Sequence, residues 1–434
     1  MNHNTEIRRD HRIPTDTQNI NKDDRTNTVL IESIVQFING DYSNVHVLDQ
    51  FFEVPEGKSF AGKSLESVLQ FLMTSYYQVS DLTLSFKALY IISMLLELEN
   101  LDFSFLMNDQ FLIRSIGLLS SKHKVMAYNV LSTLRKVINL SDDILNRCLQ
   151  LGYLDGIIQV TDFSQIRDFN ETTFIKSYQE AIVSVFDLSF LNLEAYNDKI
   201  WNIAFEFIKN SNSLIIGGGL KIMQVLINRS YKPNINEEFY QRILELSNAK
   251  ASILDLVFGI IANHHFPDNE QFTVRLFEDG FYMQILNRIE TDSELTKHFF
   301  RFLDAMTYIP PDDDPMFGKL IEILHYGTIY NRIAIIQYIY AVSFEKSNDF
   351  LVFLAENNIL AVITEFINSR VQVIGEILYL SEKVINSVIA MNAEAVLNST
   401  IDDYLESIQN MIGEYNGVYD PLIFRILNNF CERE

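Results

Sequence analysis

The stretch LFEDGF at residues 276–281 holds the pattern that decides the fold of this chain. An apolar helix end is followed by two acidic residues, a glycine and the first aromatic residue of a new apolar run. Glycine is the residue that most readily adopts the left-handed backbone conformation in which many helices end. The stretch therefore predicts that one helix ends just before Gly280 and that a second helix begins just after it.

The same junction recurs at two other places in the chain. The stretch CLQLGYLDGII at 148–158 places Gly152 between two apolar runs, and LAENNIL at 354–360 places Asn358 in the same position. Asparagine is the other residue that tolerates the left-handed conformation. Gly152, Gly280 and Asn358 each lie eight or nine positions before an apolar residue that closes the second helix.

These closing residues recur along the whole chain at a fairly regular interval. We place them at Ile38, Leu72, Leu119, Val160, Ile208, Leu246, Ile289, Leu324, Ile367 and Ile412. Their mean spacing is about 42 residues, and a period of roughly 40 to 47 residues without strands is typical of helical repeats. The spacing therefore predicts an array of stacked helical repeats.

Composition and local patterning favour helices throughout. Only 16 Gly and 8 Pro occur in 434 residues, whereas sheets and α/β folds need both at their many tight turns. Apolar residues at Ile31, Ile34, Val35 and Ile38 have the spacing of one helix face. The sequence thus predicts an all-α fold.

A helix that ends in a small polar pair, then a glycine, then an apolar helix resembles the armadillo repeat. The resemblance covers roughly residues 29 to 430. It implies a short first helix, a second helix and a longer third helix in each repeat. It also implies a right-handed α-solenoid, an armadillo/HEAT-like superhelix, of about nine to ten repeats. Such a scaffold exposes a concave groove in which extended peptides bind.

Three segments depart from this pattern. Residues 1–28 are polar and predict a disordered tail, whereas 29–434 form the expected solenoid with an acidic C-terminal capping repeat. The stretch YIPPDDDP at 308–315 predicts a loop that joins two repeats. An acidic interaction loop is the alternative for that stretch.

Charge and cysteine content limit the classes of partner. The formal net charge of −23 opposes direct binding to nucleic acid and to anionic membranes, which both need a positive surface. No run of 18 uncharged apolar residues is present, so membrane insertion is not expected. The two cysteines, Cys148 and Cys431, and the lack of an apolar leader favour a cytoplasmic or nucleocytoplasmic protein.

The sequence predicts no catalytic residues, no cofactor and no metal site. The run Gly217–Gly219 lacks the Lys-Ser/Thr of a phosphate-binding loop, so we interpret it as a turn between helices. His264 and His265 are adjacent, and adjacent helical side chains point about 100° apart, which makes them poor joint ligands. We therefore expect the protein not to be an enzyme.

Outward polar positions on the expected third helices are the candidates for a protein-binding groove. Within each helix they are spaced by three or four residues, which places them on one face. They are Lys221, Gln224 and Asn228; Asp255, Gly259 and Asn263; Lys297, Arg301 and Asp304; and, further on, Tyr338, Glu376 and Lys383. A solvated face is the alternative for each residue. Their mixed charges oppose a purely cationic ligand.

The expected function is that of a non-catalytic protein–protein interaction scaffold or adaptor, monomeric by itself. Its partner would be a protein or an extended peptide segment. One alternative is a divergent nuclear import adaptor, because the third helices of importin-α resemble one another by a Trp followed four residues later by an Asn. Asn228 and Asn263 match that Asn, but Gln224 and Gly259 stand at the Trp positions. A regulatory subunit of a kinase, phosphatase or cytoskeletal assembly is the second alternative.

Overall fold

The computed structural model describes residues 22–44, 46, 48, 63–78, 82–96, 106, 108–120, 124–160, 169–188, 193–263, 266, 269–289, 292–306, 309–397 and 400–431. Over these residues the chain forms 22 α-helices and a few short 3₁₀ turns, with no strand. The predicted all-α fold is confirmed. The helices form two compact units, residues 1–192 and residues 193–434.

The first unit contains eight described α-helices. They are α1 (Lys22–Asn39), α3 (Lys63–Tyr76), α4 (Leu82–Leu95), α5 (Asp109–Leu119), α6 (Lys124–Ile138), α7 (Asp142–Gln150), α8 (Tyr153–Gln159) and α9 (Phe169–Leu188). Helix α4 packs on α6, and α6 packs on α9. Residues 1–21 of the predicted tail lie outside the described part of the chain. Helix α1 begins at Lys22, so the predicted boundary at residue 28 was wrong and falls inside a helix.

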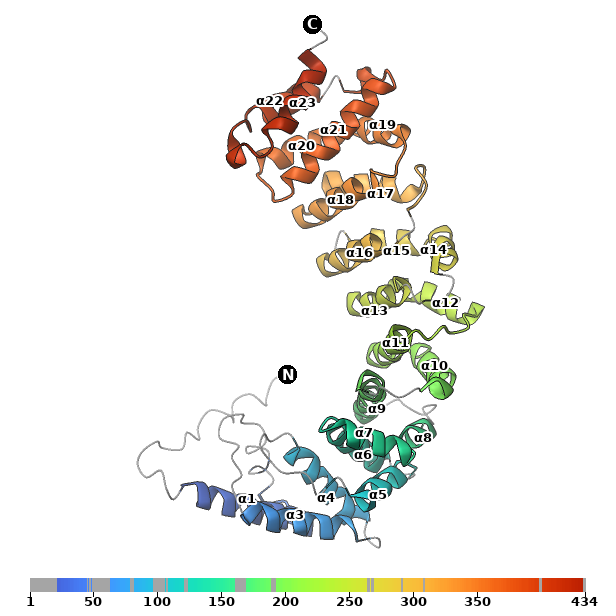
Figure 1. Ribbon diagram of the computed structural model, residues 1–434, viewed down its shortest axis with the longest axis vertical. Helices are drawn as coiled ribbons and strands as arrows, with labels where there is room; N and C mark the ends of the chain where they lie inside the picture. The colour runs from blue at the N-terminus through green and yellow to red at the C-terminus, as the bar shows by residue number, and fades with distance from the viewer. Residues whose placement is uncertain are drawn as a thin grey trace, which may run out of the picture. The chain divides into compact units, whose positions relative to one another are not determined.

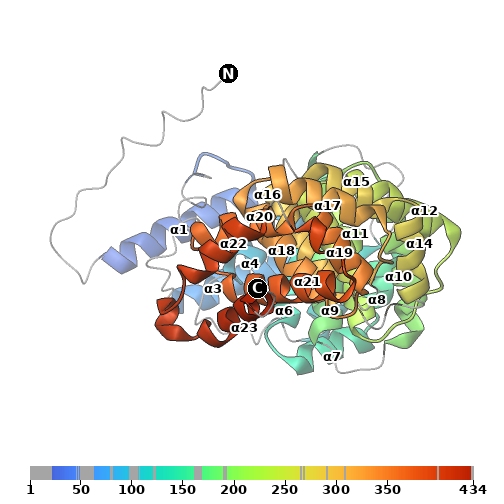
Figure 2. The ribbon, with the colours of Figure 1, turned by 90° about the horizontal axis from the view of Figure 1, so that it is seen from above.

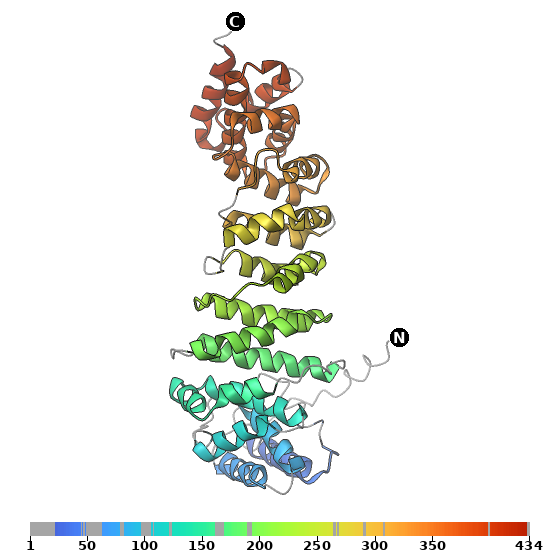
Figure 3. The same ribbon diagram turned by 90° about the vertical axis from the view of Figure 1, so that its right-hand side faces the viewer.

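The second unit contains the remaining helices. They are α10 (Glu194–Ile208), α11 (Ser213–Asn228), α12 (Glu237–Glu245), α13 (Ala251–Ile261), α14 (Asn269–Glu278), α15 (Phe281–Ile289), α16 (Ser293–Ala305), α17 (Pro315–Tyr326), α18 (Ile329–Val342), α19 (Asn348–Glu356), α20 (Ile359–Asn368), α21 (Ile374–Ala390), α22 (Ile401–Gln409) and α23 (Asp420–Cys431). Within this unit the helices are stacked in successive layers, and each layer is one repeat (Figures 1 and 3).

The longest helix of each repeat packs on the longest helix of the next. Helices α11, α13, α16, α18, α21 and α23 make these contacts in succession. In Figure 1 the helices α11, α13, α16 and α18 lie on the same side of their layers, with α10, α12, α14 and α17 on the other. The view from above also separates α12 and α14 from α16 and α18 (Figure 2). One face of this unit is therefore built from the long third helices.

The left-handed junctions are present where they were predicted. Gly152 joins α7 to α8 with φ 85°, and Gly280 joins α14 to α15 with φ 78°. Asn358 joins α19 to α20 with φ 58°. These three repeats have a short first helix, a short second helix and a longer third one. The repeats α10–α11 and α17–α18 have two helices each. In them a single helix, α10 or α17, stands in place of the first and second helices.

Most of the predicted closing residues lie within two residues of the end of a helix, whereas Leu72 lies four residues before the end of α3. Leu119, Ile208 and Ile289 are the last residues of α5, α10 and α15. The prediction at Ile412 was wrong, because α22 ends at Gln409 and Ile412 is exposed. Ile408, one helical turn earlier, is the buried residue of that repeat.

The glycine run at 217–219 was wrongly predicted as a turn. It lies in the middle of α11, where all three glycines are buried. A Cβ on Gly219 would lie 2.6 Å from the carbonyl oxygen of Ala204 and 2.8 Å from the Cβ of Phe207, both in α10. These glycines therefore allow α11 to approach α10 closely, and the helix forms because tertiary packing outweighs their poor helix propensity.

The proline- and aspartate-rich stretch joins α16 to α17, as predicted for a loop between repeats. Asp314 caps α17 by accepting a hydrogen bond from the backbone nitrogen of Met316 at 2.8 Å. Lys346, whose side chain is 2% exposed, donates to the carbonyl oxygen of Pro310 and lies 3.2 Å from Asp312. The acidic residues of this loop thus fix the connection between two repeats.

No single helix in the described ranges is both long enough and apolar enough to cross a membrane. Helices α19 and α20 meet that criterion only as a pair, and they are bent by 69° at their junction.

Candidate functional site

Helix α18 carries apolar residues on every side, interrupted by Asn331, Arg332 and Gln337, yet one of its faces is exposed. A helix of this composition is normally buried on all sides. Tyr330 in its first turn is 76% exposed, and Phe344 just beyond its end is 60% exposed. Ile333, Ala334 and Gln337 lie between them at helical spacing and are half-buried or exposed. The sequence therefore places an uncovered apolar surface on one of the long third helices.

A cavity of about 480 Å³ lies between this face and α16, and we call it the α16–α18 cavity. Helix α16 contributes two basic side chains, Lys297 and Arg301. Apolar and aromatic groups form much of the remaining wall. The lining residues are Thr296, Lys297, Phe300, Arg301, Asp304, Tyr330, Ile333, Ala334 and Gln337.

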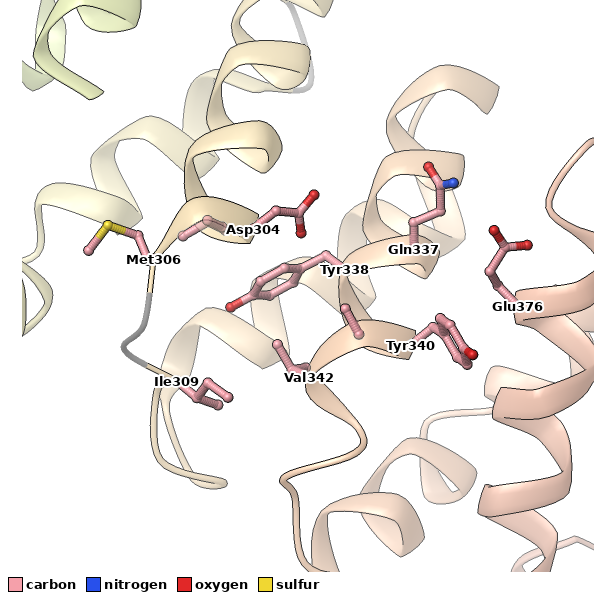
Figure 4. A pocket seen from close by; sticks show the side chains of 10 residues that line it. Asp304, Met306, Ile309, Gln337, Tyr338, Tyr340, Val342 and Glu376 are labelled. Atoms are coloured by element: carbon pink, nitrogen blue, oxygen red, sulfur yellow. The ribbon is translucent and has the colours of Figure 1, made fainter. Parts of the chain in front are cut away.

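A second cavity, of about 370 Å³, adjoins the first and extends to α21, and we call it the α18–α21 cavity. The two share Asp304 and Gln337 and together form what we call the groove. The second cavity is lined by Leu303, Asp304, Met306, Ile309, Gln337, Tyr338, Tyr340, Ala341, Val342 and Glu376. Figure 4 shows Asp304, Gln337 and Glu376 extending in the same direction from three different helices.

The polar side chains that line the groove have few internal partners. Lys297, Asp304, Gln337 and Glu376 make no hydrogen bond or ion pair with any other residue in the described part of the chain. The protein around Asp304 removes part of its hydration, which raises the pKa of this carboxyl. A positive group from a ligand would therefore be attracted to Asp304.

Tyr338 differs from the expectation that it faces outward. It is only 4% exposed, because its ring packs 5.8 Å from the ring of Phe300. Burial is the largest cause that raises the pKa of its hydroxyl, and the nearby Asp304 contributes. The hydroxyl makes no hydrogen bond with another described residue, although the side chain lines the α18–α21 cavity.

Four of the predicted groove residues bond to one another instead of lining an open surface. Asn263 donates to the side-chain oxygen of Asn228 at 2.7 Å, which links α13 to α11. Arg301 lies 2.9 Å from Asp255, which links α16 to α13, and His298 lies 2.5 Å from the same carboxylate. These pairs tie successive third helices together. Of the four, only Arg301 also reaches the α16–α18 cavity.

The remaining predicted residues lie on the expected helices but outside both cavities. Lys221 is exposed on α11. The side-chain nitrogen of Gln224 would lie 2.7 Å from a Cβ on Gly259, so this glycine leaves room for the glutamine. Lys383 donates to the carbonyl oxygen of Ser343 at 2.8 Å and lies over the ring of Phe344. It therefore caps the end of α18 and is not available to a ligand.

Sequence patterning missed the apolar part of the groove. Tyr330, Ile333, Tyr340 and Met306 line the cavities and belonged to no predicted site. Apolar residues at helical spacing normally belong to the core. The one available signal was that 329–342 carries apolar residues on every face of the helix, which is more than one core contact requires.

Groups capable of chemistry are few in the described ranges. No cluster of three or more His, Cys, Asp or Glu side chains suited to a metal occurs there, and His264 and His265 lie outside them. Cys148 is buried, which raises the pKa of its thiol to about 12. This thiol packs as a small apolar group.

Comparison with known proteins identifies similar folds only. Neither the protein-family models nor the curated proteins match this sequence. An engineered protein from a structural genomics consortium matches 92% of this chain and 98% of its own, with a TM-score of 0.57 and 10% identity. A designed armadillo repeat protein in complex with the peptide (KR)4 matches 55% of this chain and 98% of its own, with a TM-score of 0.41 and 14% identity.

A computationally designed armadillo repeat protein for modular peptide recognition matches the same share of this chain, with a TM-score of 0.41 and 14% identity, over 100% of its own length. At these identities the likeness concerns the fold and nothing further. The helix triplets and their left-handed junctions are features of the chain itself. The protein is therefore an all-α helical-repeat protein, and its fold is similar to that of the engineered protein with the TM-score of 0.57.

Proposed function

We propose that this protein is a non-catalytic interaction scaffold or adaptor that binds an extended protein segment in the groove formed by α16, α18 and α21. The observation that carries the proposal is the exposed apolar face of α18, hollowed into two adjoining cavities. Four of the polar side chains that line them, Lys297, Asp304, Gln337 and Glu376, make no hydrogen bond or ion pair with another described residue. Exposure of such an apolar face to water does not stabilise the fold. A bound segment would cover the apolar groups and pair with the free polar ones.

The size of the groove supports a peptide over a flat protein surface. The two cavities, of about 480 and 370 Å³, fall in the range of small-ligand sites. Side chains of an extended segment fill such cavities one by one, while Gln337 and the free charges bond to the segment's polar groups. The opposite charges of Lys297 and Glu376 would fix the direction in which the segment runs.

The test is selection of peptides from a random displayed library on the purified chain, followed by binding measurements on variants. Ala334 lies in the wall of the α16–α18 cavity, so Ala334→Arg fills that cavity with a long charged side chain. We expect selected peptides to lose at least about tenfold in affinity for this variant. Ala390→Arg makes the same chemical change at an exposed position outside both cavities and is the matched control.

Peptides that bind both variants as tightly as the native chain would remove the groove from the proposal. A library that yields no groove-dependent binder in repeated selections would argue against segment binding altogether. Helical circular dichroism and the melting temperature of each variant establish that the fold is intact before binding is compared.

The remaining elements of the proposal follow from the sequence. We propose a protein without catalytic activity in the cytoplasm or nucleocytoplasm, with a net charge of −23 that opposes nucleic-acid binding. Nuclear import and regulation of an enzyme assembly are special cases of segment binding. Identifying the natural protein that contains the selected segment would distinguish between these two functions.

A further inference from the structure

We propose that the joint between α16 and α18 is a hinge within the second unit. About this hinge, α18 and the helices that follow it move relative to α16 and the helices that precede it. The inference goes beyond the proposed function, because it concerns the free chain and holds whether or not a segment binds. Even flexing of every joint is open to any stack of repeats in which each repeat contacts only its neighbours. A single loose joint is a property of this chain.

Before this joint, side-chain bonds tie each long helix to the next. Asn263 of α13 donates a hydrogen bond to Asn228 of α11 at 2.7 Å. Arg301 of α16 lies 2.9 Å from Asp255 of α13. Hydrogen bonds depend on distance and angle, so these pairs restrict how far one helix can slide or tilt on the other. Helices α11, α13 and α16 are therefore held as one body.

After the joint, side-chain bonds tie α18 to the helices that follow. Arg332 in the first turn of α18 donates two hydrogen bonds to Glu365 of α20, at 2.8 and 2.6 Å. Lys383 of α21 donates to the carbonyl oxygen of Ser343, the residue that ends α18, at 2.8 Å. Helix α18 is therefore held together with α20 and α21.

At the joint itself such bonds are absent. Within the described residues, no hydrogen bond or ion pair joins α16 to α18. The polar side chains on either side of it, Lys297, Asp304 and Gln337, are bonded to no other described residue. The two helices instead meet through apolar groups, with the rings of Phe300 and Tyr338 5.8 Å apart. Apolar contact is non-directional, so it allows one helix to slide or tilt on the other.

The two cavities give α18 room to move. The α16–α18 cavity of about 480 Å³ lies at the joint itself, and the α18–α21 cavity of about 370 Å³ adjoins it. A close-packed interior resists displacement, because interlocked side chains would overlap. The outward face of α18 borders open space instead, so a small tilt of this helix meets little steric resistance.

A buried hydrogen bond locates the pivot at the beginning of α18. Asn331 in the first turn is 1% exposed and donates to the carbonyl oxygen of Ile289 at 2.9 Å. Ile289 ends α15, so this bond fixes the beginning of α18 against the preceding repeat. Asp304 and Gln337 lie on later turns of α16 and α18, where no bond joins the two helices (Figure 4). Movement therefore separates the later turns more than the first.

The test measures distance distributions between two spin labels on the full chain by pulsed electron paramagnetic resonance. Burial raises the pKa of the Cys148 thiol to about 12 and makes it unreactive, so only Cys431 is replaced, by serine. Labels at Ala305→Cys and Ala390→Cys span the hinge, from α16 to α21. Labels at Lys221→Cys and Ala305→Cys span two bonded joints, from α11 to α16, and are the matched control. All three labelled positions are exposed.

We expect the distribution across the hinge to be at least about twice as broad as that of the control pair. Gln337→Arg places a guanidinium near Asp304, since the two residues line both cavities. The new ion pair should narrow the distribution to the width of the control. Adding Asp304→Asn removes the charge that this arginine pairs with and should restore the native width.

The reciprocal variant acts on a bonded joint. Asp255→Ala removes the contacts of α13 with Arg301 and His298 and should broaden the control distribution. Circular dichroism and the melting temperature establish that each variant is folded. Equal widths of the two native distributions would show that flexing is shared by all joints and would overturn the inference. A distribution that stays as broad in Gln337→Arg as in the native chain would also overturn it.

Discussion

Glycine occupies three physically different environments in this chain, and alanine substitution distinguishes them. Gly280 has φ 78° and nothing within 4 Å of its missing Cβ, so Gly280→Ala meets only the backbone penalty of about 1 kcal/mol. Gly219→Ala places a Cβ 2.6 Å from the carbonyl oxygen of Ala204 and should cost about 2–3 kcal/mol. Gly318→Ala is unhindered within α17 and should stabilise the protein by about 0.5–1 kcal/mol.

Urea unfolding of the three variants under identical conditions measures these differences. Equal losses for Gly280→Ala and Gly219→Ala would mean that α10 and α11 can separate without cost. A loss on Gly318→Ala would contradict the exposed, unhindered environment of that position.

A second residue-scale prediction concerns acid stability at Glu237. Arg275 donates two hydrogen bonds to this carboxylate, at 2.7 and 2.8 Å, and Gln241 donates another. These contacts lower the pKa of Glu237 from its ordinary 4.5 to about 2. A carboxyl whose pKa falls on folding stabilises the folded state above its unfolded pKa, and this contribution is lost as pH falls from about 4.5 to 2.

The variant Glu237→Gln removes that titration while keeping the shape of the side chain. We expect the difference in urea midpoint between native and variant protein to be largest at pH 7 and to shrink by pH 3. A difference that stays constant over this range would show that Glu237 titrates alike in the folded and unfolded chain.

At the scale of elements, the connection between α16 and α17 depends on a single buried cation. Lys346 donates to the buried carbonyl oxygen of Pro310 and lies between the rings of Phe317 and Phe350. Lys346→Met keeps the apolar contact but leaves that carbonyl without a donor, which should cost about 1–3 kcal/mol. The measurement is the melting temperature together with the rate of proteolytic cleavage within 309–315.

The exposed Lys199→Met is the control, since that side chain has no comparable buried acceptor. Unchanged melting and cleavage in Lys346→Met would show that Asp312 and the proline backbone hold the loop without the lysine.

The elements differ in how far the sequence predicts them. The junctions at Gly152, Gly280 and Asn358 could be predicted because a left-handed residue is a local steric requirement. The helix through Gly217–Gly219 could not, since it depends on contact with α10, which local propensity does not contain. Within the site, Lys297, Arg301, Asp304 and Glu376 could be found from their spacing.

The same spacing misplaced Tyr338, and it gave no sign that Asn228 and Asn263 bond to each other. Both outcomes depend on the rotation of one long helix against its neighbour. A single sequence records which residues share a helix face, but the angle of that face relative to the next helix is set by packing of distant side chains.

At the scale of the whole molecule, stability depends on each repeat burying the apolar face of the repeat before it. Helices α22 and α23 cover α20 and α21 and bury Tyr404, Ile408, Ile423 and Ile426. A chain that ends after residue 391 would expose the partner surfaces of these side chains. We expect a melting temperature lower by several degrees and association that increases with protein concentration.

Light scattering over a range of concentrations and thermal melts test this expectation. The full-length variant Arg425→Gln breaks only the contact with Glu382 and should remain monodisperse. A truncated chain that stays monodisperse with an unchanged melting temperature would mean that α20 and α21 need no cover.

The left-handed junctions also have a consequence for how such a gene can change. Gly280 and Asn358 stand at the same joint of two different repeats, so a crossover between their codons would delete or duplicate whole repeats in register. Each product would still place a left-handed residue between a first and a second helix. The chain can thus lengthen or shorten by recombination without inventing a new connection, and the number of repeats becomes a heritable variable.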